Sequence, residues 1–392
     1  MTPLLEDMFD TVIVRFGGEI GIKAPMTRKQ YERRLTSNIK ATLKHCAISY
    51  STFNRKPGRL YIKTHQAEKA AKQVSRVFGV QSLSPAIETS TDLDDMLDHS
   101  LKVASSRFVH GKRFAVRCHR IGEHRFTSQD ICTLVGEHLR VFLPKLKLRV
   151  DLEHPEHTLH VEIRDENAYV FTQIIKGPGG LPLGTQPKLI CLLKGDVQST
   201  VACWMTMKRG CPPIFVHIAN GITKRHEDIN KVKLAAQALM KWNIGFPRKL
   251  RVTRYHLDLQ KISEEHTSEL TAFISKRLKL QTAHRIAEAE SAEGIVTGDI
   301  LGKKATQTIH SFRIQDEAVK GFPVYRPLIG LDEAETAETA KTIGLNKTSK
   351  EEIKQLRPEA IMKPEEIKKI EHELKVKKLV EEAVKNLRIL EL

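Results

Sequence analysis

Residues 189–210, LICLLKGDVQSTVACWMTMKRG, combine an apolar run, a short polar turn and a helical pattern, which is an arrangement that could bind an anionic ligand. The apolar run predicts a strand over 189–193. After a polar turn, side chains recur at the helical spacing i, i+3, i+4 and i+7: Val201, Trp204, Met205 and Lys208. A turn between a strand and a helix suits phosphate, because the first helical turn offers unpaired N–H donors and a positive dipole end. The spacing therefore predicts an anion site here, although the turn itself, Lys194–Ser199 (KGDVQS), has one glycine and one acid and is poor material for wrapping an anion.

Alternating strand and helix patterns surround this turn and must position it. A Gly/Pro-rich stretch at 177–186 marks a domain boundary. Beyond it, over 187–345, strands are expected at 189–193, 214–219, 250–257, 294–297 and 324–326. Helices are expected at 199–209, 227–242, 265–290, 306–312 and 332–343. This rhythm predicts a doubly wound parallel sheet with its site at the carboxyl ends of the strands. Residues 346–392 are expected to form a charged helical tail that either packs or faces solvent.

The front half of the chain carries most of the positive charge. The 392 residues have a net charge of +17, and between Lys23 and Arg76 there are 14 basic residues against 2 acidic ones. A strand over 11–16, an Arg-rich helix with Tyr31, Leu35 and Ile39 on its apolar face, and a turn and strand over 53–63 indicate a small α+β domain over 1–75. Clustered cations favour RNA, since each phosphate contact releases counterions, although a solvated helix surface is the alternative for any single basic helix.

A second small module is expected over 76–176. Helices are predicted at 92–109 and 128–142, with strands at 113–117 and 147–152 and a final hairpin at 157–163 and 168–174. The cations expected to contact RNA across both modules are Arg15, Lys23, Arg28, Lys29, Arg33, Arg34, Arg55, Lys56, Arg59, Arg117, Arg120 and Arg125.

Cysteine usage and hydropathy exclude some classes of protein. Six cysteines are scattered without a C-x-x-C pair: Cys46, Cys118, Cys132, Cys191, Cys203 and Cys211. This argues against a disulfide framework and against a zinc knuckle. Because the sequence has no run of 18 apolar residues and no signal-peptide pattern, we expect a cytoplasmic protein without a membrane partner.

Several stretches together resemble the tRNA 4-thiouridine synthetase (tRNA sulfurtransferase) family. VIVRFGGEIGIK resembles its N-terminal ferredoxin-like segment, and FAVRCHRIGEHRFTSQDICTLVGEHL resembles its THUMP module. GGLPLGTQ, IVTGDILGKKATQT and YRPLIGLD resemble its PP-loop ATP-pyrophosphatase domain. The likeness is collinear over residues 11–345.

The resemblance implies a function for each half. The front half would bind tRNA, and the PP-loop domain would adenylate a uridine carbonyl with ATP and Mg²⁺ before a persulfide sulfur displaces AMP. The nucleotide contacts implied by the motifs are Leu192, Leu193, Lys194, Gly195, Ser199, His217, Ile218, Lys276, Gly298 and Gln307.

The turn departs from the family pattern Ser-Gly-Gly-x-Asp-Ser. Asp196 replaces a glycine and would repel phosphate oxygens, by on the order of one to several kcal/mol. Gln198 replaces a carboxylate and is a weaker ligand for a hard cation, whereas Lys194 supplies a compensating charge. Alternatively, Asp196 or Ser199 simply caps the following helix.

Sulfur chemistry is the second departure. The late catalytic cysteine of active members is missing, no rhodanese-type domain is expected, and Cys211 is the one plausible exposed thiol. Two hypotheses follow: an ATP-dependent sulfurtransferase supplied by a separate persulfide carrier or cysteine desulfurase, or a catalytically inactive tRNA-binding paralogue acting as scaffold, chaperone or partner subunit. The sequence leaves open whether the chain forms a homodimer.

Overall fold

The computed structural model describes residues 8–219, 226–255, 268–303, 306–345 and 364–392. The chain divides into two compact units, 1–180 (unit 1) and 181–392 (unit 2). Among the described residues, none of the helices is long and apolar enough to cross a membrane.

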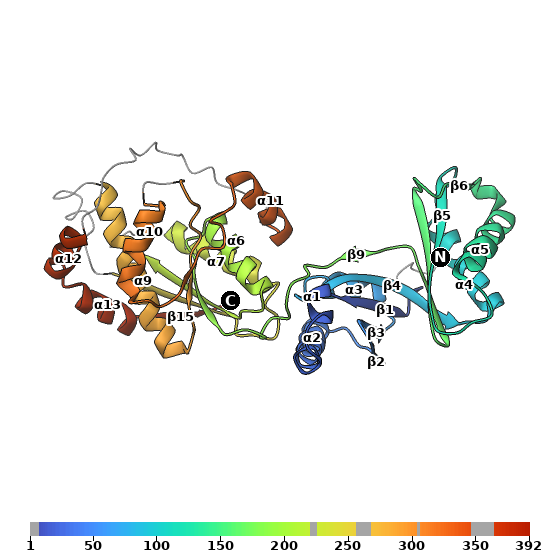
Figure 1. Ribbon diagram of the computed structural model, residues 1–392, viewed down its shortest axis with the longest axis horizontal. Coiled ribbons are helices and arrows are strands. Elements are labelled where there is room, and N and C mark those ends of the chain that lie inside the picture. The colour runs from blue at the N-terminus through green and yellow to red at the C-terminus, as the bar shows by residue number, and fades with distance from the viewer. Residues whose placement is uncertain (1–7, 220–225, 256–267, 304–305, 346–363) are drawn as a thin grey trace. The chain divides into compact units, whose positions relative to one another are not determined.

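The first part of unit 1 is an antiparallel sheet with two main helices (Figure 1). Its elements are β1 (Thr11–Phe16), α1 (Gly18–Gly21), α2 (Pro25–His45), β2 (Thr52–Lys56), β3 (Arg59–Lys63), α3 (Ala67–Val74) and β4 (Val80–Ser90). Helix α2 begins at Pro25, whose missing N–H costs nothing in a first turn. Its buried face carries Tyr31, Leu35 and Ile39, as the helical spacing predicts.

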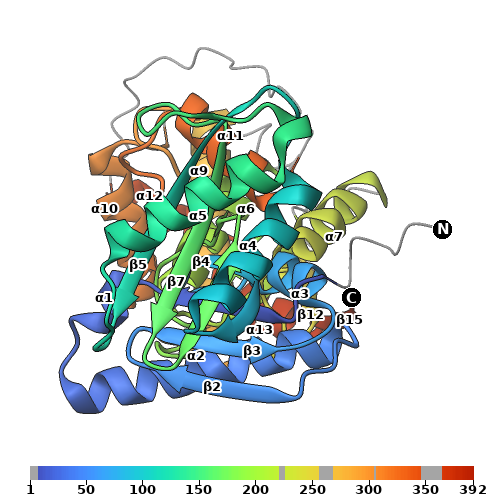
Figure 2. The ribbon, with the colours of Figure 1, turned by 90° about the vertical axis from the view of Figure 1, so that its right-hand side faces the viewer.

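The second part of unit 1 continues the same sheet. Its elements are α4 (Leu93–Arg107), β5 (Arg113–Ile121), α5 (Ser128–Phe142), β6 (Arg149–Val150), β7 (His157–Arg164), β8 (Asn167–Phe171) and β9 (Ile175–Lys176). Strand β4 pairs with β1 through its first half and with β8 through 87–90, which gives the order β2-β3-β1-β4-β8-β7-β5-β6. Helices α4 and α5 lie side by side against this part of the sheet (Figure 2).

Unit 2 contains the parallel sheet. Its elements are β10 (Leu189–Leu192), α6 (Val197–Lys208), β11 (Pro213–Ala219), α7 (His226–Met240), β12 (Lys249–Arg254), α9 (Ser268–Glu290), β13 (Ile295–Val296), α10 (Ile309–Asp316), β14 (Val324–Tyr325) and α11 (Glu333–Ile343). The order β14-β13-β10-β11-β12 is parallel throughout. The chain winds outward in one direction from β10 to β12 and then returns to β13, so the strand order reverses beside β10.

The last residues belong to unit 2 as well. They form α12 (Pro364–Glu373), α13 (Val376–Lys385) and β15 (Arg388–Glu391). The two helices bury Ile367, Ile370 and Val380, and β15 pairs antiparallel with β12.

The predicted fold class is confirmed: an α+β front half is followed by a doubly wound parallel sheet. Strands β2, β4, β9 and β15 were not predicted. In β4, VQSLSPAIETS, a central proline and several serines hid the strand, yet Pro85 lies opposite Val12 within the ladder. Strand β15 follows a Lys/Glu-rich segment that indicated only helix. The expected helix start at 265, the strand end at 256–257 and tail residues 346–363 lie outside the described residues.

Candidate functional site

The turn after β10 lies at the carboxyl edge of the parallel sheet, where the strand order reverses. The N–H of Leu193 donates to the carbonyl of Val216 over 2.8 Å, and His217 Nδ1 lies 2.8 Å from the carbonyl oxygen of Leu193. The N–H of Lys194 donates to Ser199 Oγ over 3.1 Å. Backbone and side-chain bonds therefore fix the course of the turn between β10 and α6.

Asp196 is the N-cap of α6. Its carboxylate accepts the N–H of Ser199 over 2.9 Å and also the Ser199 hydroxyl. Thr200 Oγ1 donates to the Asp196 carbonyl over 2.7 Å. The capping interpretation of Asp196 is thus confirmed, and the carboxylate satisfies donors that an anion at this helix end would otherwise meet.

Two glycines allow close approach at the same place. Gly195 has a φ of +81°, and a Cβ there would lie 3.0 Å from backbone atoms of Lys231 and Val232. A Cβ on Gly298 would lie 2.4 Å from Ser199 N and 2.5 Å from Gln198 C. The turn after β13 therefore packs directly onto the first turn of α6, which any larger residue at Gly298 would prevent.

A buried carboxylate organises the turn after β13. Asp299 is fully buried and accepts from Thr297 Oγ1 over 2.8 Å, from Gln307 Nε2 over 3.0 Å and from Lys276 Nζ over 2.7 Å. Burial acts to raise the pKa of Asp299, but the charges of Lys276 and Lys194 outweigh it and hold the pKa well below the usual value. Asp299 is therefore an anion at neutral pH.

Lysines crowd this edge of the sheet. Lys194 follows β10, while Lys276 and Lys279 are three residues apart on α9 and so share a face. Burial, opposed by Asp299, lowers the pKa of Lys276 to about 8. Burial, reinforced by the charge of Lys194, lowers the pKa of Lys279 to about 7. The edge is a desolvated cationic site.

The donor set does not fit Mg²⁺. This cation is usually held through one or two free carboxylates together with phosphates. Here Asp196 caps α6, and Gln198 offers an amide. Asp299 already holds the Lys276 ammonium, the Arg326 guanidinium and two neutral donors. No group of three or more His, Cys, Asp or Glu suited to a metal occurs in the described part of the chain.

The cysteines near this site are poor nucleophiles. Cys191 and Cys203 are buried in the core between β10 and α6. Cys211 is half-buried, and burial raises its pKa to about 11. Its thiol is protonated at neutral pH, which argues against a thiolate that carries sulfur.

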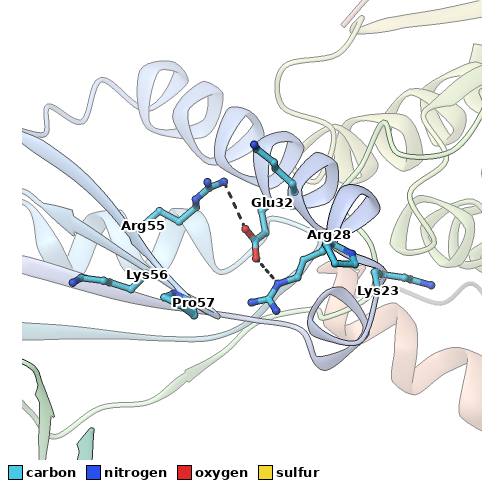
Figure 3. Close-up of a pocket in the computed structure, with 8 residues that line it drawn as sticks. Lys23, Arg28, Glu32, Arg55, Lys56 and Pro57 are labelled. Carbon is cyan, nitrogen blue, oxygen red and sulfur yellow. Dashed lines mark hydrogen bonds and ion pairs between the residues drawn. The ribbon is translucent and has the colours of Figure 1, made fainter. Parts of the chain in front are cut away.

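A basic pocket in unit 1 gathers five of the predicted RNA-contacting cations. It has a volume of about 390 Å³ between the start of α2 and the β2–β3 hairpin. Figure 3 shows Glu32 at its wall, where the carboxylate binds Arg28 Nε over 2.9 Å and Arg55 Nη1 over 3.6 Å. The remaining cations that line it are Lys23, Lys29 and Lys56. A single acid thus positions two arginines in a cavity with a large excess of positive charge.

Two other predicted cations lie in a buried ion cluster. Glu162 on β7 binds Arg15 Nη2 over 3.0 Å, Arg59 Nε over 3.2 Å and Arg164 Nε over 3.1 Å. The Arg15 side chain is only 14% exposed, so this guanidinium links β1 to β7 and offers little surface to a phosphate.

The remaining predicted cations lie on three elements of unit 1. Arg33 and Arg34 are exposed on α2. Arg120 donates to the carbonyl of Gly122 over 3.0 Å, Arg117 donates to the carbonyl of Leu152, and Arg125 is exposed in the turn after β5. Whether these residues contact RNA stays a prediction.

The ten residues predicted to bind nucleotide converge on the carboxyl edge of unit 2. Leu192, Leu193, Lys194, Gly195 and Ser199 surround the turn after β10. His217 and Ile218 lie near the carboxyl end of β11. Gly298 precedes Asp299, and Asp299 binds both Gln307 and Lys276. Sequence reasoning missed Lys279, Asp299 and Glu32. Lys279 could have been found from its three-residue spacing to Lys276, and Asp299 from its place in the TGD turn.

The fold and the strand-end site define an α/β domain of the PP-loop class joined to a ferredoxin-like module and a THUMP module. Family models match in the same order. The ferredoxin-like model covers residues 11–84, the THUMP model 90–173, and the model described as "Thiamine biosynthesis protein (ThiI)" 184–376.

Individual proteins agree with the family models. The chain is 34% identical to a "Probable tRNA sulfurtransferase" of Methanothermobacter thermautotrophicus, covering 86% of this chain and 85% of that protein. It is 35% identical to the protein of the same name from Methanobrevibacter smithii, covering 87% and 88%. A solved complex of a 4-thiouridine synthetase with RNA and bound ATP superposes with a TM-score of 0.83 at 25% identity, covering 97% of this chain and 99% of that one. The chain belongs to the tRNA sulfurtransferase family.

Proposed function

We propose that this protein binds tRNA and catalyses ATP-dependent thiolation of a uridine, with sulfur delivered by a separate carrier. The observation that carries the proposal is the strand-end site of unit 2, where Gly298 packs against the first turn of α6 and the neighbouring Asp299 binds Lys276. A family member solved with RNA and bound ATP shares the fold over nearly the whole chain, which supports the same pair of ligands here.

The basic pocket of unit 1 supports the RNA part of the proposal. Its arginines are oriented by Glu32, and a guanidinium fork suits phosphate oxygens. The lysines around it add charge, and Lys56 is also paired with Asp165 over 3.3 Å. Ammonium groups act as point charges, which suits contacts along the RNA backbone more than base recognition. With tRNA as the substrate, we expect the protein to work in the cytoplasm.

The chemistry would take place in two displacements. The uridine carbonyl oxygen attacks the α-phosphorus of ATP, an O–P bond forms, and pyrophosphate leaves with the electron pair of the broken P–O bond. The terminal sulfur of the carrier's persulfide then bonds to the activated carbon, and AMP leaves with the former carbonyl oxygen. A second thiol of the carrier attacks the carrier's own persulfide sulfur, so that the S–S bond breaks and its electron pair stays on the sulfur of the uridine. The carrier is left with a disulfide, which a cellular thiol reduces. Lys194 and Lys276 would stabilise the negative charge that develops on pyrophosphate. Because the Cys211 thiol is protonated, the persulfide is assigned to a carrier.

A second candidate is a tRNA-binding paralogue without catalysis, acting as a scaffold, chaperone or partner subunit. Two observations favour it: the Asp196 carboxylate at the phosphate end of α6 and the amide of Gln198 in place of an acid. On this view unit 2 is retained for its fold, and the site is a structural remnant.

Two measurements distinguish the candidates. ATP–pyrophosphate exchange is measured with purified protein and tRNA, and 4-thiouridine is quantified in tRNA from a strain lacking the gene. Exchange together with loss of 4-thiouridine supports the enzyme, whereas neither effect supports the paralogue. In the strain, Cys211→Ser is expected to restore thiolation as fully as wild type. Failure of this variant alone would show that Cys211 handles sulfur.

A further inference from the structure

The carboxylates at the strand-end site of unit 2 are already engaged by the protein. Asp196 is bound to the N–H and hydroxyl of Ser199. Asp299 is bound by Lys276, Thr297 and Gln307, and its second oxygen lies 3.6 Å from Arg326 Nε. Releasing either oxygen pair toward a metal ion would leave α6 without its cap or a lysine buried without its partner. Both changes are costly, so these acids serve the fold.

The cations of the site are less fully compensated. Lys276 is paired with Asp299, and its ammonium also lies 5.4 Å from the centre of the Phe312 ring. Lys279 is half-buried, and its ammonium makes no hydrogen bond or ion pair with any residue that the structure describes. Partial burial disfavours the charged form of an amine, and an anionic ligand beside it would offset that cost.

The charges that face Lys279 indicate what the site would take. Besides Asp196, they are the ammonium groups of Lys194 and Lys276. Arg326 also lies near Lys276, but it is ion-paired with Asp316 and Asp299. A ligand with several neighbouring negative charges matches this arrangement better than a single carboxylate does. The phosphates of a nucleotide have that form.

We propose that Lys194, Lys276 and Lys279 bind the polyphosphate chain of a nucleotide directly, without a divalent metal ion. The inference deepens the proposed function, because it concerns the same site and rests on that site binding a nucleotide. Lysine ammoniums take over the charge compensation that Mg²⁺ supplies where free carboxylates are present to hold it.

The test compares nucleotide affinity with and without metal. ATP binding to the full chain is measured by titration calorimetry in excess EDTA and again in excess Mg²⁺, at constant ionic strength. We expect the two dissociation constants to agree within about threefold. A loss of affinity greater than about tenfold in EDTA, or no binding in either buffer, overturns the proposal.

Variants test the lysines themselves. Lys279→Met is expected to weaken ATP and inorganic tripolyphosphate by about tenfold or more in EDTA, as for loss of a charged hydrogen-bond donor. Lys279→Arg is expected to retain most of the affinity, and Lys369→Met, at an exposed position on α12, to retain all of it. Urea unfolding followed by tryptophan fluorescence verifies that each variant is folded. Equal affinity of Lys279→Met and Lys369→Met would overturn the role of Lys279.

The outcomes separate this proposal from the function. Metal-independent binding without 4-thiouridine formation retains the lysine site and removes the enzyme. Thiolation accompanied by strictly Mg²⁺-dependent ATP binding retains the enzyme and removes the lysine site.

Discussion

Replacing Gly298 by alanine would test how the strand-end site is assembled. The new Cβ would lie 2.4 Å from Ser199 N, 2.5 Å from Gln198 C and 2.7 Å from Ser199 Cα. All three are backbone atoms, so no side chain can rotate away, and the TGD turn and α6 must separate by about 1 Å to restore van der Waals contact. Overpacking of this kind costs about 1–3 kcal/mol.

Tryptophan fluorescence is a suitable assay, because the two tryptophans of the chain, Trp204 and Trp242, both lie in unit 2 and contact each other edge to face. For a unit of this size, each kcal/mol lowers the melting temperature by about 2–4 °C. A displacement of about 1 Å at the site is also expected to weaken ATP binding or turnover by up to about 100-fold.

Gly330→Ala is the matched control. Gly330 is exposed, and a Cβ there has no atom within 4 Å. This variant is expected to be neutral or slightly more stable, since alanine restricts the unfolded chain. If Gly298→Ala matches Gly330→Ala in both stability and ATP affinity, the close packing of the TGD turn on α6 is refuted.

Three further predictions concern other parts of the chain. Glu162→Gln should destabilise unit 1 by about 3–5 kcal/mol, because three arginines lose their buried counter-charge. Burial acts to raise the pKa of Glu162, but the charges of Arg15 and Arg59 outweigh it and lower the pKa. The free energy of unfolding of the wild type should therefore fall as the pH drops below the usual carboxyl range. Acid titration of the Glu162→Gln variant should lack this pH dependence. The double variant Lys29→Gln, Lys56→Gln should bind tRNA with a weaker salt dependence: the slope of log affinity against log salt concentration should decrease by about 0.7–0.9 per lost contact. The control Lys102→Gln, on α4, should leave this slope unchanged. Equal slopes for the double variant and the wild type would refute the basic pocket as the RNA contact. ATP binding should take up protons at pH 8, because an anion raises the lowered pKa values of Lys276 and Lys279, and the affinity for ATP should fall from pH 7 to 9. Calorimetry in buffers of different ionisation enthalpy measures the proton uptake, and proton release would contradict the prediction.

Sequence patterns predicted the fold class because the hydrophobic periodicity and the turn residues between elements were consistent along most of the chain. The apolar run 189–193, the helical spacing after it and the Gly/Pro-rich stretch correspond to β10, α6 and the passage between the two units. Strand β4 was not predicted because its serines and Pro85 are typical of turns. Its pairing with β1 and β8 joins residues far apart in the sequence, which a local pattern does not reveal.

The chemistry of the site was only partly readable from the chain. The motifs brought Lys194, Gly298 and Gln307 to one place, and Asp196 could be recognised as either an anion-repelling group or a cap. The cap became clear only from the Ser199 N–H contact. Glu162 could not be predicted to hold Arg15, because the two residues are 147 positions apart and meet only when β1 and β7 join one sheet.

Strand β15 has a consequence for the behaviour of unit 2 in solution. Along residues 250–252, β12 pairs with β11 on one side and with β15 on the other. If β15 detached, the N–H and C=O groups of β12 would form an open strand edge, and such an edge pairs readily with another chain. Fraying of these last four strand residues would therefore be a starting point for aggregation of otherwise folded protein.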